Sequence, residues 1–171
     1  MGTGGLFLRK ARAWVSDRPT GFLWVERDRL AASGYPASRR QLEWLRRQGI
    51  DMILTLTEEP LPAEWTSGLQ MSFRHVPMED HAPPPREALE EAASMIQGEI
   101  RSGRRVLVHC LAGQGRTMCV VAAYLMKERG AAPQDVLESL RSMRPGAVEK
   151  GQEKAIFEYA ETVRGPDKSA G

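Results

Sequence analysis

The chain has 171 residues, of which 42% are hydrophobic and 27% charged, and its formal net charge is +2. These values are typical of a one-domain globular protein and exclude disordered and fibrous classes, and the two cysteines are too few for a disulfide framework. The positive charge is not gathered in a basic stripe, and no apolar run is long enough to cross a bilayer. We therefore expect a cytoplasmic protein with neither nucleic acid nor a membrane as its main partner.

The first part of the chain predicts an extension followed by strands and one helix. Residues 1–20 are interpreted as an N-terminal extension, in which the basic stretch 6–15 forms a packed or frayed helix and not a membrane-surface helix. The elements expected next are a strand at 21–25, a helix from a Ser38 cap to about residue 48, and strands at 51–56 and 71–76.

Beyond a proline-rich loop at 77–85, the second part predicts one strand and four helices. These are a helix at 86–101, a strand at 105–109, an apolar helix at 117–126, and two amphipathic helices, one after Pro133 and one around Tyr159. Strands that alternate with helices indicate an α/β fold with a central, mostly parallel sheet flanked by helices. We predict a single domain at 21–163 and a C-terminal tail at 164–171.

The junction between the strand at 105–109 and the next helix carries the chemistry. Five residues separate Cys110 from Arg116, and two of them, Gly113 and Gly115, let the backbone curl without side-chain obstruction. A strand, a glycine-containing loop and a helix start direct backbone N–H groups at one point, which favours phosphate binding. The residues expected around the phosphate are Leu111, Ala112, Gly113, Gln114, Gly115 and Arg116.

Cys110 lies in this predicted cradle, where the helix dipole and the Arg116 guanidinium both favour a thiolate. We therefore expect Cys110 to attack phosphorus while Arg116 holds two phosphate oxygens, with no metal or cofactor required. A merely buried cysteine fits this spacing less well, although burial is the better interpretation of Cys119. His75 and His81 have no third ligand at metal spacing.

Residues 105–117 resemble the active-site loop of the protein tyrosine phosphatase superfamily, which reads His-Cys, two residues, Gly, two residues, Arg, and Ser or Thr. Residues 21 to about 160 are similar in order and spacing to the compact atypical dual-specificity phosphatases. The resemblance implies hydrolysis of phosphotyrosine in phosphoproteins, and by extension of phosphoserine or phosphothreonine, through a phospho-cysteine intermediate.

The resemblance also implies roles for residues other than Cys110. Asp80, shortly before a run of prolines, would be the general acid, with Glu79 as its neighbouring alternative. His109 would steady the loop by hydrogen bonding, or be only a satisfied core histidine. Thr117 would help the sulfur leave through its hydroxyl, or be only a first-turn helix residue.

Gln152 and Glu58 each have two interpretations, one as a functional residue of the family and one as an ordinary surface residue. Gln152 would place the hydrolytic water, or begin an exposed helix. Glu58 would brace Arg116, or lie in a solvated turn.

Other functions remain open from the sequence. A lipid or RNA phosphatase would use the same loop, but Leu111, Ala112 and Gln114 bring no positive charge to it. A phosphate-binding pseudophosphatase module would be favoured by loss of Cys110, Arg116 or Asp80, and all three are present. The sequence does not predict an oligomeric state.

Overall fold

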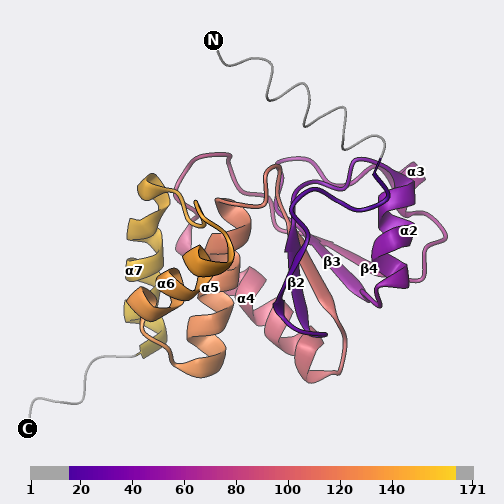
Figure 1. Ribbon diagram of the computed structural model, residues 1–171. Helices are drawn as coiled ribbons and strands as arrows, with labels where there is room; N and C mark the ends of the chain where they lie inside the picture. The colour runs from indigo at the N-terminus through magenta and orange to yellow at the C-terminus, as the bar shows by residue number, and fades with distance from the viewer. Residues whose placement is uncertain (1–15, 165–171) are drawn as a thin grey trace, which may run out of the picture.

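The computed structural model describes residues 16–164, so the helix expected at 6–15 and most of the predicted tail lie outside the described residues (Figure 1). Within residues 16–164, no helix is both long and apolar enough to span a membrane. The strands are β1 (Leu23–Glu26), β2 (Leu30–Ser33), β3 (Met52–Thr55), β4 (Ser72–His75) and β5 (Val106–His109). The helices are α2 (Arg39–Arg47), α3 (Ala63–Thr66), α4 (Arg86–Arg101), α5 (Arg116–Arg129), α6 (Pro133–Met143), the 3-10 turn η1 (Lys150–Gln152) and α7 (Glu153–Arg164).

The five strands form one sheet in the order β1-β2-β5-β3-β4, and only the β1–β2 pair is antiparallel. The expected α/β fold with a mostly parallel sheet is therefore confirmed. The sequence analysis placed no strand at Leu30–Ser33, which is wrong. This segment reads Leu-Ala-Ala-Ser and has little intrinsic strand propensity, but pairing with β1 on one side and β5 on the other holds it extended.

Helices cover both faces of the sheet (Figure 1). Alternate residues of the central strands point to opposite faces, as strand geometry requires. One face packs against α4 to α7 through Leu30, Ala32, Met52, Leu54, Val106 and Val108. The other packs against α2 through Ala31, Ile53 and Leu107.

The carboxyl ends of the parallel strands meet at one edge of the sheet, and β5 lies at its centre. This edge is where ligands bind in open α/β sheets, because loops and helix starts converge there. The chain leaves β5 at His109 and enters α5 at Arg116, so residues 110–115 form the connecting loop. Every residue of α5 from Arg116 to Met126 is buried, which fixes the end of the loop against the core.

Candidate active site

The loop after β5 wraps around the sulfur of Cys110. This residue is 3% exposed, and its Sγ accepts a hydrogen bond of 3.2 Å from the backbone N–H of Gly113. Gly113 has a φ of +71°, and a Cβ added there would lie 2.4 Å from the carbonyl oxygen of Ser33 at the end of β2. A Cβ on Gly115 would lie 2.8 Å from the side-chain oxygen of Gln152. Gly113 needs glycine because backbone atoms leave no room for a side chain there, whereas the groups near Gly115 are the ends of side chains, which can move.

Arg116 is buried at the start of α5, and its guanidinium faces two carboxylates. Nη1 donates to Glu58 Oε2 at 2.9 Å and to the Met78 carbonyl at 2.9 Å, and Nη2 lies 2.8 Å from Asp80 Oδ1. Among the described residues, Arg116 Nε has no hydrogen-bond partner. Backbone N–H groups of Glu58 and Asp80, and then the Arg116 side chain, hold the pKa of Glu58 below its usual range.

Asp80 therefore lies beside the loop arginine, where the sequence analysis expected the acid. Its backbone N–H donates to Glu58 Oε1 at 2.9 Å, so Glu58 contacts both Asp80 and Arg116. Glu58 thus lies within the site and is not only a solvated turn residue. Glu79, the alternative acid, is exposed and makes no described ion pair with Arg116.

Two side-chain contacts bind the segment after Asp80 to the 3-10 turn η1, which lies just before α7. His81 has a φ of +60°, and its Nδ1 lies 3.0 Å from Glu149 Oε2. The hydrogen bond to Glu149, followed by the charge of Asp80, raises the pKa of His81. Gln152 Nε2 donates to the Ala82 carbonyl at 3.1 Å.

Gln152 is 1% exposed, so an exposed helix start is the wrong interpretation of this residue. Its amide packs against Gly115 on one side and bonds the proline-rich loop on the other. Its Oε1 also lies 3.6 Å from Cys119 Sγ, which is fully buried as expected. Burial raises the pKa of the Cys119 thiol, so this cysteine stays protonated. Gln152 thus joins the two loops that carry Cys110 and Asp80.

His109 lies just before the loop and Thr117 just after it, and both residues are buried. His109 Nε2 lies 2.9 Å from Thr55 Oγ1, and its Nδ1 lies 3.3 Å from the Cys110 carbonyl. Burial lowers the pKa of His109 to about 4, so the ring is neutral near pH 7 and connects the loop to β3. Thr117 Oγ1 has no hydrogen-bond partner among the described residues.

The remaining loop positions form its outer surface. Leu111 is 59% exposed and Ala112 is exposed, whereas Gln114 is half-buried. Their side chains carry no charge. Backbone N–H groups of neighbouring segments hold the loop in place. The Leu111 carbonyl accepts from the Tyr35 N–H at 3.0 Å, and the Gln114 carbonyl accepts from the Val148 N–H at 3.1 Å.

Arg144 is a component of the site that the sequence analysis missed. It follows the last residue of α6, is 8% exposed, and donates to the carbonyls of Gly113 and Gly21. An arginine at the end of an amphipathic helix is ordinarily a solvated residue that complements the helix dipole, so nothing in the local sequence indicates that this one turns back under the loop at 110–115.

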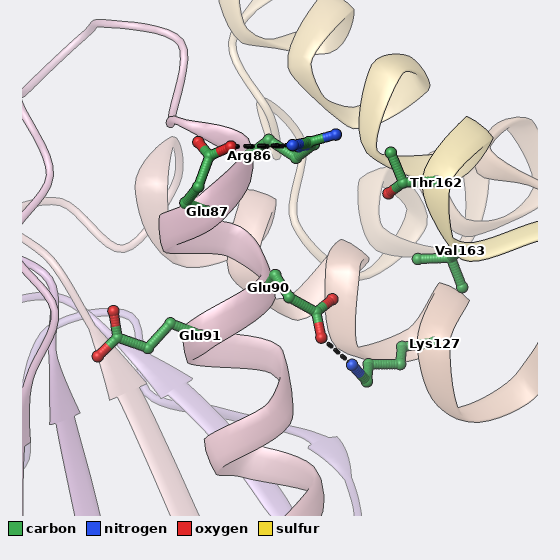
Figure 2. A pocket seen from close by; sticks show the side chains of 7 residues that line it. All are labelled: Arg86, Glu87, Glu90, Glu91, Lys127, Thr162 and Val163. Atoms are coloured by element: carbon green, nitrogen blue, oxygen red, sulfur yellow. Dashed lines mark hydrogen bonds and ion pairs between the residues drawn. The ribbon is translucent and has the colours of Figure 1, made fainter.

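A separate groove of about 730 Å³ lies between α4, α5 and α7 (Figure 2). It is lined by Arg86, Glu87, Glu90, Glu91, Lys127, Thr162 and Val163. Its charged side chains, apart from Glu91, are paired within the protein, because Glu90 binds Lys127 and Arg86 binds Glu87. Its lining contains no cysteine, so the loop around Cys110 is the better candidate for chemistry. In residues 16–164, no group of three or more His, Cys, Asp or Glu side chains is arranged to hold a metal ion.

Comparison with known proteins gives one family. A family model described as "PTP-SAK: Swiss Army Knife protein, DSP-PTPase phosphatase domain" matches residues 19–157. Tyrosine-protein phosphatase cdcA of Emericella nidulans is 31% identical over 108 residues, which are 63% of this chain and 18% of that protein. Phosphatidylglycerophosphate phosphatase PTPMT2 of Arabidopsis thaliana is 26% identical over 147 residues, which are 84% of this chain and 64% of that protein.

Solved structures agree with this result. A crystal structure of a mutant form of Tk-PTP superimposes with a TM-score of 0.76 and 31% identity, covering 84% of this chain and 96% of that one. By contrast, the chain covers less than two thirds of the length of the curated relatives above.

Proposed function

Because the chain belongs to the DSP-PTPase phosphatase family and is a cysteine-based phosphatase, we propose that it hydrolyses phosphotyrosine in cytoplasmic phosphoproteins, and phosphoserine or phosphothreonine more slowly. We assign this activity to a catalytic domain at residues 21–163. One observation carries the assignment of roles: Cys110, Arg116 and Asp80 lie together at the carboxyl end of β5, and the Gly113 N–H points at the sulfur.

In the first step, the Cys110 sulfur attacks phosphorus and the bond from phosphorus to the leaving oxygen breaks. Asp80 donates its proton to that oxygen, which would otherwise leave as a poor, charged group. Arg116 and the loop amides stabilise the charge on the equatorial oxygens. The unpartnered Arg116 Nε is a donor available for one of them.

The ion pair between Asp80 and Arg116 must open when the substrate binds. A dianionic phosphate competes for Arg116 Nη2, which now lies 2.8 Å from Asp80 Oδ1. Displaced from the guanidinium, the carboxyl group is free to turn towards the leaving oxygen.

In the second step, water attacks the phospho-cysteine, Asp80 takes a proton from that water, and the phosphorus–sulfur bond breaks to release phosphate and the thiolate. Gln152 lies between the loops of Cys110 and Asp80, so its amide is in place to orient the water. The unpartnered Thr117 hydroxyl is available to hydrogen-bond the departing sulfur.

Burial and charge support phosphotyrosine as the preferred substrate. Cys110 is only 3% exposed, so a substrate phosphate must reach into the site to meet its sulfur. The phosphate of tyrosine extends further from the peptide backbone than that of serine and therefore reaches it more easily. Exposed Leu111 offers an apolar surface to the ring beside Cys110. Glu58, Asp80 and Glu149 line the same region with negative charge, which opposes a headgroup carrying several phosphates.

A lipid phosphatase is the second candidate, because PTPMT2 matches 84% of this chain and is named a phosphatidylglycerophosphate phosphatase. Such a lipid carries a single phosphomonoester and so does not need several cations. Exposed Leu111 would then contact the glycerol part of the headgroup and not an aromatic ring.

Measurement of kcat/KM separates the two candidates. The substrates are a phosphotyrosine peptide, the same peptide with phosphothreonine, and vesicles containing phosphatidylglycerophosphate, all at one salt concentration. We expect the phosphotyrosine peptide to give the highest value. A clear preference for the lipid would transfer the assignment to the second candidate.

A further inference from the structure

Arg144 is a buried cation with no carboxylate partner among the described residues. It is 8% exposed, and its described hydrogen bonds go only to the carbonyls of Gly113 and Gly21. An arginine stays protonated at neutral pH, and a buried charge is costly unless an opposite charge compensates it. Burial lowers the pKa of Arg144, and a negative charge on the nearby Cys110 sulfur would raise it.

The other arginine at the site has a different charge balance. Arg116 pairs with Glu58 at 2.9 Å and with Asp80 at 2.8 Å, so two carboxylates already compensate its charge. With substrate absent, Arg116 is therefore a weak source of positive potential for the sulfur. Arg144 has no such compensation, and its full charge acts on the loop.

Arg144 also acts on the sulfur through the backbone. Gly113 accepts from Arg144 through its carbonyl and donates to Cys110 Sγ through its N–H, at 3.2 Å. A Cβ on Gly113 would lie 2.8 Å from Arg144 Nη1, so the guanidinium is packed directly against this residue. Fixing Gly113 fixes the direction in which its N–H points.

We propose that Arg144 is a positioning residue that stabilises the Cys110 thiolate, both as its counter-charge and by orienting the Gly113 N–H. The proposal rests on the proposed function, in which that thiolate is the nucleophile. Other neighbours of the sulfur compensate little: His109 is neutral, and Cys119 is protonated. The remaining favourable contribution comes from the start of α5.

The test is the alkylation rate of Cys110 by iodoacetamide as a function of pH, with the labelled cysteine identified by peptide mass spectrometry. Only the thiolate reacts, so the rate at acidic pH reports the thiolate fraction. In Arg144→Gln we expect the rate at pH 6 to fall about tenfold, because the thiolate loses its counter-charge. Arg144→Lys keeps a charge but not the paired donors, and we expect a smaller fall of about threefold.

Arg141→Gln is the matched control. Arg141 lies on the last turn of α6 and, like Arg144, donates to two backbone carbonyls, those of Ala147 and Val148, but it pairs with Glu153 and bonds no residue of the loop. We expect it to lower the unfolding temperature without changing the alkylation rate at pH 6 by more than about twofold. Unfolding temperatures of all variants are measured alongside.

An unchanged rate in Arg144→Gln, or an equal fall in Arg141→Gln, would overturn the inference. If Arg144→Gln does not fold, Arg144→Lys decides on the same criterion. The assay needs no turnover, which separates the two proposals. A phosphatase whose alkylation is indifferent to Arg144 refutes this inference alone. The expected alkylation pattern in a chain that releases no phosphate refutes the proposed function alone.

Discussion

The replacement Gly113→Ala tests the geometry of the loop directly. The new Cβ would lie 2.4 Å from the Ser33 carbonyl oxygen and 2.6 Å from the Ser33 carbonyl carbon, and both are backbone atoms that cannot rotate away. The φ of +71° adds strain of about 1 to 2 kcal/mol for a residue with a side chain. Overpacking adds about 1 to 3 kcal/mol, so we expect a loss of about 2 to 5 kcal/mol in the free energy of unfolding.

The loss of activity should exceed what destabilisation explains. Displacing Gly113 moves the N–H that lies 3.2 Å from Cys110 Sγ, and a hydrogen bond to a charged group is worth about 1.5 to 3 kcal/mol. We therefore expect kcat/KM of the folded variant on p-nitrophenyl phosphate to fall about 10- to 100-fold.

Two other glycines provide controls for this variant. Gly103 has a φ of +78° but nothing within 4 Å of an added Cβ, so Gly103→Ala should cost about 1 to 2 kcal/mol of stability and no activity. Gly98 lies inside α4 with open space around it, so Gly98→Ala should stabilise by about 1 kcal/mol. Urea unfolding and steady-state kinetics measure both quantities. If Gly113→Ala behaved like Gly103→Ala, the close packing of β2 against the loop would be refuted.

The remaining predictions concern protons and reactivity. Asp80→Asn should lower kcat about 10²- to 10⁴-fold and remove the high-pH limb of the kcat profile, whereas Glu79→Gln should do much less; the reverse order would place the acid one residue earlier. Burial holds the pKa of His109 at about 4 in the folded chain, while the unfolded chain takes up that proton near 6.5. The contribution of neutral His109 to the free energy of unfolding should therefore be fully present above pH 6.5 and be lost, by about 3 kcal/mol, as the pH falls towards 4. In urea titrations at a series of pH values, His109→Gln should not show this loss. Cys119 is fully buried, so peptide mapping after brief iodoacetamide treatment should find label on Cys110 and little on Cys119.

Much of the fold followed from local patterns in the sequence. Ser38 accepts a hydrogen bond from the Gln41 N–H at the start of α2, as its position before an apolar periodic segment predicted. The apolar face of α4 is buried at Leu89, Ala92, Ala93, Ile96 and Ile100. The strand β2 was missed because its four residues are held extended by partners on both sides and not by their own propensity.

That missed strand also hid the reason for one glycine. The sequence suggested that Gly113 gives the loop freedom to curl, whereas the structure shows that the end of β2 leaves no room for a side chain there. Contacts of this kind join residues far apart in the chain. Two further hydrogen bonds depend in the same way on how α6 and α7 fold back onto the sheet: Arg144 to Gly113, and Gln152 to Ala82. No local sequence pattern predicts such long-range contacts.

The most direct test of the account is to trap the covalent intermediate. Wild-type protein is mixed with a radiolabelled phosphotyrosine peptide, quenched in acid within the first turnover, and digested to locate the label, with Cys110→Ser and an EDTA-treated sample in parallel. We expect label on the peptide that contains Cys110, none in Cys110→Ser, and no effect of EDTA. Label on another residue, or turnover that survives in Cys110→Ser, would contradict it.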